Sequence, residues 1–131
     1  MTNKELVQQA FENFSQGNIP AILDTLSDDI NWEMQGPADL VPYMGKRKGK
    51  EQVLDFFMQI ANTSDFQEFA PHEYIAEGDK VVAFGRAVAT NKQTGKQSSN
   101  NWSMHWTFDN GKVTRYRNYS DTWDIAQSFI K

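Results

Sequence analysis

The stretch that decides the fold is residues 96–120, KQSSNNWSMHWTFDNGKVTRYRNYS. Two segments in which bulky and polar residues alternate flank Asp109-Asn110-Gly111, and Asn-Gly in such a position is a strong signal for a β-hairpin. Successive side chains of a strand point to opposite faces of its sheet. The bulky face of the first segment carries Trp102, Met104, Trp106 and Phe108. The pattern therefore predicts two antiparallel strands with an aromatic-rich buried face.

More strands are expected before this hairpin. They lie at residues 66–77 and 80–91, together with a short strand that contains Ile30, Trp32 and Met34. The hairpin strands themselves are expected at residues 96–108 and 112–120. Helices followed by an antiparallel meander are typical of an α+β domain. A strongly curved sheet wrapped around the N-terminal helices would form a cone that is open at one end.

Apolar residues recur at helical spacing in four other segments. The first helix is expected to begin at a capping box of Thr2 and Glu5 and to end at Gly17. The other helices are expected from Ile19 to near Ser27, with Pro20 in the first turn, at residues 50–62 and at residues 122–130. Residues 35–49 contain two of the four prolines and three of the eight glycines, which predicts a long irregular loop that could serve as a lid.

The composition excludes several classes of protein. The chain has 131 residues, enough for one core, so residues 1–131 are expected to form a single domain. Its net charge of −4 and its single short basic cluster, residues 46–50, disfavour nucleic acid as a partner. No apolar run approaches the ~18 residues of a membrane span and no secretion signal opens the chain, so a cytoplasmic location is expected. Aromatic residues make up 13% of the chain, and they must either fill the core or line a cavity.

Four segments, taken together, resemble a known family. They are residues 17–37 (GNIPAILDTLSDDINWEMQGP), 42–57 (PYMGKRKGKEQVLDFF), 77–87 (EGDKVVAFGRA) and 105–124 (HWTFDNGKVTRYRNYSDTWD). In order and spacing the chain resembles the nuclear-transport-factor-2-like superfamily, in its SnoaL-like or ketosteroid-isomerase-related branch. The resemblance implies a cone-shaped, cystatin-like α+β barrel with an apolar pocket, which forms a homodimer through the convex face of the sheet. That fold hosts isomerases, hydrolases, cyclases and proteins without any catalytic activity, so it does not fix the function.

The resemblance also indicates where the catalytic groups of relatives would lie. Ketosteroid isomerases use a carboxylate base, a tyrosine and a protonated aspartate. The matching positions hold Met34, Ala10, and Trp102 or Ser103, so none of these groups is present. The acid/base carboxylate of SnoaL-like cyclases matches Asn118, which forms hydrogen bonds but takes up no proton at neutral pH.

Asp121 and Asn118 are the candidate catalytic residues that remain. Asp121 closes the last strand near the presumed rim of the pocket, but it also precedes the C-terminal helix, where it would cap free backbone N–H groups. Glu33 is expected on the face opposite Trp32, exposed or at an interface. Limonene-epoxide hydrolases activate water with an Asp-Arg-Asp arrangement. Asp121 could supply one of the two carboxylates, but the neighbouring strand has no second carboxylate at a matching position.

Other polar residues favour structural roles. The strand arginines Arg86, Arg115 and Arg117 are expected to pair with carboxylates such as Glu73 and Asp121. The two histidines are His72 and His105, and they are far apart in the sequence. No His-x-x-x-His or comparable cluster occurs, so neither a metal nor a cofactor is expected.

The candidate ligand-binding residues come from the strands, the loop and the helix expected around the opening of the cone. They are Trp32, Tyr43, Phe57, Trp102, Met104, Trp106, Tyr116 and Asn118. Apolar walls with a few polar anchors are the usual composition of a small-molecule site. We therefore expect a small, mostly apolar ligand, such as a polycyclic or other ring compound.

Three classes of function are open at this point. An isomerase, cyclase or hydrolase would need a titratable group at the pocket floor, with Asp121 or Glu33 as the plausible base. A binding protein without catalysis would have neutral polar groups there. A protein-interaction module would have a filled cone and a large exposed apolar patch.

Overall fold

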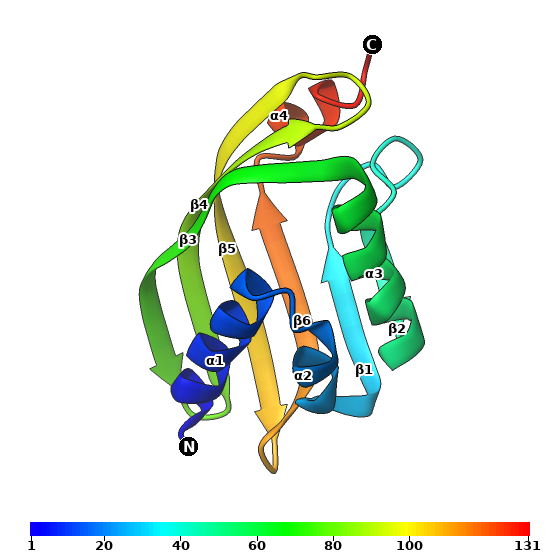
Figure 1. Cartoon of the computed structure of the whole chain (residues 1–131). Helices are drawn as coiled ribbons and strands as arrows, with labels where there is room; N and C mark the ends of the chain where they lie inside the picture. Colours follow the sequence, from blue (N-terminus) through cyan, green and yellow to red (C-terminus); the bar gives the residue numbers. More distant parts are fainter.

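The computed structural model describes residues 1–131 and contains four helices and six strands (Figure 1). In chain order they are α1 (Asn3–Ser15), α2 (Ile19–Asp24), β1 (Leu26–Met34), β2 (Gly45–Lys48), α3 (Lys50–Thr63), β3 (Ser64–Glu77), β4 (Lys80–Asn91), β5 (Gln97–Asp109), β6 (Lys112–Ser120) and α4 (Thr122–Gln127). The strands of the predicted meander are present, with ends within about two residues of the predicted ones.

The strands form one sheet in the order β2-β1-β6-β5-β4-β3. From β3 to β6 each strand pairs antiparallel with the next, as the hairpin pattern predicts. β1 lies on the far side of β6 and runs parallel to it, because the chain passes through α3 and the whole meander before it returns to β1. This long-range pairing places residues of the first and last strands side by side on the concave face.

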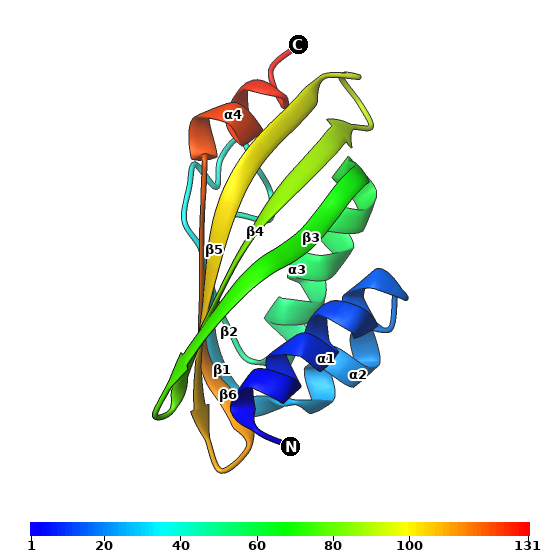
Figure 2. The ribbon, with the colours of Figure 1, turned by 90° about the vertical axis from the view of Figure 1, so that its left-hand side faces the viewer.

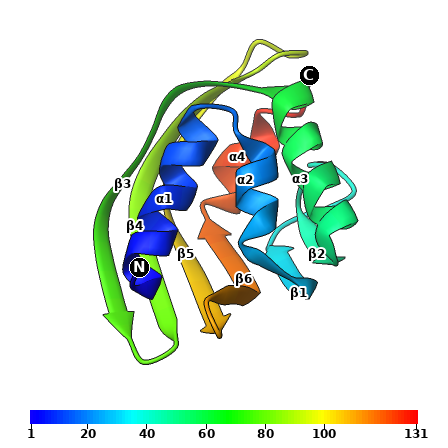
Figure 3. The ribbon, with the colours of Figure 1, turned by 60° about the horizontal axis from the view of Figure 1, so that its bottom comes forward.

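The sheet curves around the helices. Figure 2 shows α1, α2 and α3 on the concave side of the sheet, and Figure 3 shows α2 between α1 and α3. The pairing of β3 with β4 shifts register between Phe66 and Glu68 and again between Pro71 and Glu73, and β-bulges of this kind bend and twist a strand. The prediction of an α+β domain with a curved sheet around the N-terminal helices is confirmed, and the sheet does not close on itself.

The first helix begins at the predicted capping box. The Thr2 Oγ1 atom accepts a hydrogen bond from Glu5 N at 3.1 Å, and Glu5 Oε1 accepts one from Thr2 N at 2.8 Å. Hydrogen bonding from the backbone N–H and the side chain of Thr2 lowers the pKa of the Glu5 carboxyl. The apolar face of α1 then packs on the core through Leu6, Phe11 and Phe14.

Three of the predicted boundaries are wrong. The second helix ends at Asp24 rather than near Ser27, because Leu26 already belongs to β1 and is buried in the core. The last helix ends at Gln127 and not at residue 130. Residues 35–49 are not irregular throughout, because Gly45–Lys48 pairs with β1 as an edge strand. That strand has no alternation of apolar and polar residues, so the sequence pattern does not predict it. Its charged side chains protect the edge of the sheet from aggregation.

Candidate functional site

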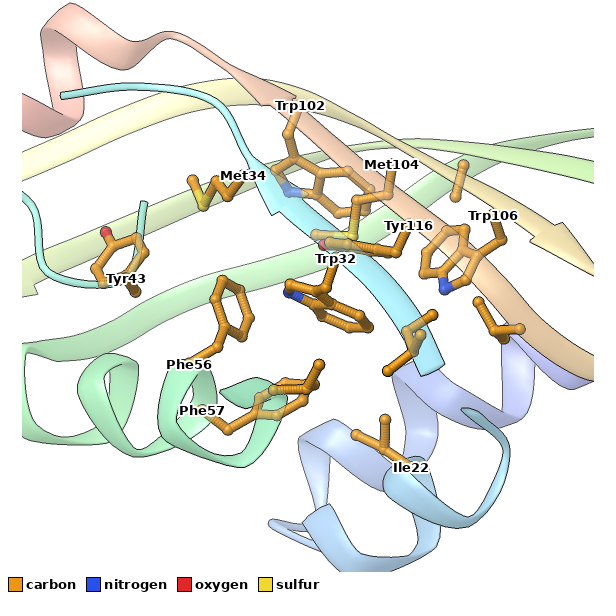
Figure 4. Close-up of a cluster of buried hydrophobic side chains, with 14 of the residues drawn as sticks. Ile22, Trp32, Met34, Tyr43, Phe56, Phe57, Trp102, Met104, Trp106 and Tyr116 are labelled. Carbon is orange, nitrogen blue, oxygen red and sulfur yellow. The ribbon is translucent and has the colours of Figure 1, made fainter. Parts of the chain in front are cut away.

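A cavity of about 110 Å³ lies between the concave face of the sheet and the helices. Of the 29 residues on its wall, 24 are hydrophobic and the other five are Thr25, Ser98, Asn100, Asn118 and Ser120. No Asp, Glu, Lys, Arg or His belongs to the wall. The wall includes every candidate ligand-binding residue named from the sequence, namely Trp32, Tyr43, Phe57, Trp102, Met104, Trp106, Tyr116 and Asn118. Figure 4 shows how most of these side chains gather on one side of β1, β5 and β6.

The middle of the wall is a row of aromatic rings set by the strand register. Trp32 of β1 is paired with Tyr116 of β6, which is paired with Trp106 of β5. The Trp32 and Tyr116 rings are stacked with centroids 3.7 Å apart, and the Trp106 ring meets Tyr116 edge to face at 5.3 Å. Phe56 and Phe57 of α3 contact the other side of Trp32 at 5.3 and 5.7 Å. Because each ring is held by at least one other, this part of the wall has few alternative packings.

A second aromatic group surrounds Trp102. Its ring is stacked with Phe11 of α1 at 5.5 Å and with Phe69 of β3 at 5.3 Å, and these two rings lie 6.1 Å from each other. Gly85 of β4 is its partner in the sheet. A Cβ atom on Gly85 would lie 2.3 Å from the Trp102 Cζ2 atom and 2.4 Å from the backbone oxygen of Ala70. The glycine therefore makes the space in which the indole lies.

Three polar residues of the wall form a hydrogen-bonded chain along β6. The Ser120 hydroxyl donates to Asn118 Oδ1 at 2.6 Å, and Asn118 Nδ2 donates to the Tyr116 hydroxyl at 3.2 Å. Burial raises the pKa of Tyr116 well above its ordinary value, although the hydrogen bond with Asn118 acts in the opposite direction. Tyr116 is thus a neutral phenol at physiological pH, and Asn118 is an amide held in one orientation.

Tyr43 reaches the wall from the segment between β1 and β2. The segment is packed against the protein, since Val41, Tyr43 and Met44 are all buried. Arg47 fixes it from the outside, because its guanidinium donates to the backbone oxygen of Pro42 at 3.0 Å and forms an ion pair with Asp55 at 2.7 Å. Burial raises the pKa of the Tyr43 hydroxyl to about 12, against a smaller opposite effect of its hydrogen bond with Ser64.

The carboxylates considered as bases lie away from the wall. Asp121 is exposed and caps α4, where its Oδ1 atom accepts a hydrogen bond from Asp124 N at 3.1 Å. Glu33 lies on the opposite face of β1 and forms an ion pair with Arg117 at 3.2 Å, with both side chains less than 15% exposed. Of the two candidate catalytic residues, only Asn118 is on the wall.

The arginines and histidines considered in the sequence also lie outside the cavity. Arg86 and Arg117 are paired with carboxylates, but the partners are Glu68 and Glu33 rather than the predicted Glu73 and Asp121. His105 is on the convex face, where its Nε2 atom lies 3.0 Å from the Ser103 hydroxyl. No group of three or more His, Cys, Asp or Glu side chains is placed to hold a metal ion. No helix of the chain is long and apolar enough to cross a membrane.

The sequence reasoning missed several wall residues that come from other elements. Phe11, Phe14 and Phe69 enclose the cavity from α1 and β3, and Asn100 adds a polar group from β5. The helical spacing of Phe11 and Phe14 indicates a buried face, but it does not say whether that face meets packed side chains or a cavity. Asn100 could have been found, because it shares strand parity with Trp102 and Met104.

Comparison with known proteins gives the family. The SnoaL-like domain family matches residues 7–116 of the chain. An NTF2-like protein of unknown function from Burkholderia pseudomallei has a similar structure, with a TM-score of 0.89, 22% identity and complete coverage of both chains. An NTF2-like protein from Burkholderia thailandensis gives a TM-score of 0.90 at 20% identity, with 100% of this chain and 99% of the other covered.

A third similar structure comes from a co-crystallisation with a small molecule. It is that of TerC co-crystallised with polyporic acid, with a TM-score of 0.84, 23% identity and 98% of each chain covered. At these identities the likeness shows the fold alone. No curated protein matches the sequence.

Proposed function

The chain belongs to the SnoaL-like domain family, and from that premise we propose that residues 1–131 form one domain that binds a small, mostly apolar molecule in the cavity on the concave face of the sheet. The composition of the wall carries this proposal. Aromatic and aliphatic side chains make up most of it, a few neutral polar groups are placed among them, and no charged side chain belongs to it. Such a wall favours an apolar body with a few hydrogen-bonding atoms.

The size of the cavity limits the ligand. An apolar cavity of about 150 Å³ in another protein is large enough for benzene. The cavity here is smaller, about 110 Å³, so a single ring or a short branched chain would fit with a small movement of the wall, and a polycyclic compound only after a larger one. Met34 and Met104 are on the wall, and the flexible methionine side chain adapts readily to a larger guest.

Binding without proton transfer is the function that this wall supports best. Acid–base catalysis needs a group whose pKa lies near the working pH within reach of the substrate. The titratable residues of the wall are Tyr43 and Tyr116, and burial raises the pKa of both. We propose that Asn118 orients the ligand and that Asp121 has no catalytic role, because its carboxylate is exposed and occupied in capping α4.

Styrene is a suitable probe for this proposal, since it is a single planar ring with a short apolar substituent. We expect it to raise the melting temperature and to change tryptophan fluorescence, because Trp32 and Trp102 are on the wall. Ala87→Leu would put a larger side chain on the wall and should weaken binding at least tenfold. Ala76→Leu, outside the wall, is the matched control. If styrene and comparable apolar rings cause no shift up to their solubility limits, the proposed function is wrong.

We also propose that two copies of the chain pair through the convex face of the sheet. Ile75, Phe84 and Tyr119 are 52%, 36% and 39% exposed there, and Phe84 and Tyr119 both neighbour Ser103 of β5. Sedimentation velocity tests the pairing: Phe84→Lys should yield monomers. Leu54→Lys is the control, because Leu54 is similarly exposed on α3. A wild-type chain that sediments as a monomer at micromolar concentration would contradict the pairing.

A further inference from the structure

Three buried polar atoms on the cavity wall have no hydrogen-bond partner within the protein. They are Trp32 Nε1, Trp102 Nε1 and Asn100 Oδ1. Their residues are only 3%, 4% and 7% exposed, respectively. Buried polar groups in proteins are nearly always paired, and each exception needs an explanation. The protein has five such side-chain atoms, and these three belong to residues on the wall of one cavity, whereas the other two, Ser27 Oγ and Arg47 Nε, lie elsewhere.

The unpaired atoms come from two strands, β1 and β5, that lie on either side of β6. Asn100 and Trp102 are two residues apart on the same face of β5, and Trp32 lies on β1. In Figure 4 the indole nitrogen of Trp102 lies on the ring edge toward Met34, that of Trp32 lies on the ring edge toward Phe56, and the Tyr116 hydroxyl lies on the corresponding edge of its ring. The polar edges of these three rings therefore face the same side of the cavity.

Donors outnumber acceptors in this group. Each indole N–H donates only. The Tyr116 hydroxyl accepts from Asn118 and donates its proton to no protein atom. The only unpaired acceptor is Asn100 Oδ1. A ligand that satisfies the wall must therefore bring an oxygen atom that accepts hydrogen bonds.

The charge of the ligand follows from the absence of charged side chains on the wall. A carboxylate would lose its hydration in the cavity and meet no cation there. An ammonium group would likewise find no carboxylate. A carbonyl oxygen brings strong accepting capacity at a much lower cost of desolvation.

Resting on the binding function proposed above, we infer that the cavity selects a neutral single-ring compound that carries a carbonyl oxygen, held by the indole N–H groups of Trp32 and Trp102. Asn100 Oδ1 accepts a hydrogen bond from a hydroxyl group of the ligand where the ligand has one. The aromatic rings of the wall pack against the apolar part of the ligand. The two indole N–H groups fix its orientation, because they bind the carbonyl end.

Benzaldehyde and styrene test this inference, because the two molecules have nearly the same shape and differ in C=O against C=CH₂. Each hydrogen bond gained should favour benzaldehyde about three- to tenfold in Kd. Benzoate, the anionic analogue, should bind more weakly than either. Equal Kd values for benzaldehyde and styrene would overturn the inference and leave the proposed function standing. If neither compound binds, the proposed function itself fails.

Variants assign the preference to the two indoles. Trp32→Phe and Trp102→Phe each remove one N–H and should reduce the ratio of the styrene Kd to the benzaldehyde Kd. Trp106→Phe is the comparison variant: it makes the same change on the same wall, at an indole whose N–H also has no partner within the protein but is less completely buried. The ratio is the informative quantity, because a general loosening of the cavity affects both probes alike. A ratio that Trp106→Phe lowers as much as the other two variants would refute the assignment.

A spectroscopic measurement covers the case in which a variant fails to fold. The four tryptophans give four indole N–H signals in a ¹H–¹⁵N spectrum of the unchanged protein. Benzaldehyde should move the Trp32 or Trp102 signal downfield, as expected for a new hydrogen bond, whereas styrene should not. Trp123, 72% exposed on α4, is the internal reference. Identical shifts with the two probes would contradict the inference.

Discussion

Replacing Gly85 by alanine should distort the cavity by displacing Trp102. The added Cβ atom would lie 2.3 and 2.6 Å from two atoms of the indole and 2.4 Å from the backbone oxygen of Ala70. Contacts this short do not persist, so the indole, strand β3 or both must move. The indole has little freedom, because Phe11 and Phe69 are both stacked against it and also contact each other.

The magnitude follows from the cost of overpacking. Adding one methylene to a packed core typically costs about 1–3 kcal/mol, and the backbone contact places Gly85→Ala near the upper end. For a chain of 131 residues, 3 kcal/mol corresponds to a drop in Tm of roughly 10 °C. Gly78→Ala is the control. Gly78 has φ +58° and open space around it, so that variant measures backbone strain alone, about 1 kcal/mol.

Urea unfolding followed by circular dichroism measures both variants, and a double variant isolates the clash. Trp102→Phe removes ring atoms that meet the new Cβ, so Gly85→Ala should cost less in that background, with a coupling energy of at least about 1 kcal/mol. If Gly85→Ala is no more destabilising than Gly78→Ala, or if the two changes are additive, the packing of Trp102 on Gly85 is not as described. Styrene binding should weaken in Gly85→Ala to the extent that the indole is displaced.

Three further predictions concern ionisable groups. Asp121→Asn should keep the stability within about 0.5 kcal/mol because asparagine also caps helices, whereas Asp121→Ala should lose about 1 kcal/mol; a large loss of styrene binding in either variant would show that Asp121 acts on the ligand. Because burial raises the pKa values of Tyr43 and Tyr116, these tyrosines ionise in the unfolded chain before they ionise in the folded protein as pH rises. The free energy of unfolding should therefore fall above pH ~10 by about 1.4 kcal/mol per pH unit for each tyrosine, until the folded-state pKa is reached, which is about 12 for Tyr43. Tyr43→Phe and Tyr116→Phe should each make this decrease less steep in urea titrations. Because no other titratable group is on the wall, the Kd for styrene should be constant from pH 6 to 9, and a change above threefold by calorimetry would point to an ionisable group that contacts the ligand.

The local pattern of the chain carries most of the fold. The alternation around Asp109-Asn110-Gly111 predicts the hairpin of β5 and β6, because register and burial in an antiparallel pair follow from side-chain parity. The same parity identifies Trp102, Met104 and Trp106 as neighbours on one face. Such information is local, since it needs only the order of residues along one or two strands.

Pairings between distant segments could not be predicted in this way. No pattern in residues 26–34 states that β1 lies parallel to β6, and hence that Trp32 stacks on Tyr116. The partners of Arg86 and Arg117 depend equally on the global register, which is why ion pairs were expected but with other carboxylates. The role of Gly85 could not be predicted for a related reason. A glycine in a strand indicates that another part of the chain comes close, but the sequence does not show that this part is Trp102, 17 positions away.

The high aromatic content of the chain raises the question whether the rings form a core or a binding site. Because the sheet is curved, the same rings do both: they pack in the core and they line the cavity. The aromatic side chains of β1, β5 and β6 lie on a sheet face that curves too strongly for α1, α2 and α3 to fill the space inside it. The rings therefore stack on one another and leave a cavity of about 110 Å³. A methyl group on Gly85 would displace the Trp102 indole, which belongs to the wall of this cavity. The hydrogen-bonded chain from Ser120 to Tyr116 keeps polar atoms on the wall without charge. Two buried indole N–H groups without partners are costly for a core that serves stability alone. That cost is intelligible if the cavity exists to be occupied, and the comparison of benzaldehyde with styrene measures directly how much of it a ligand recovers.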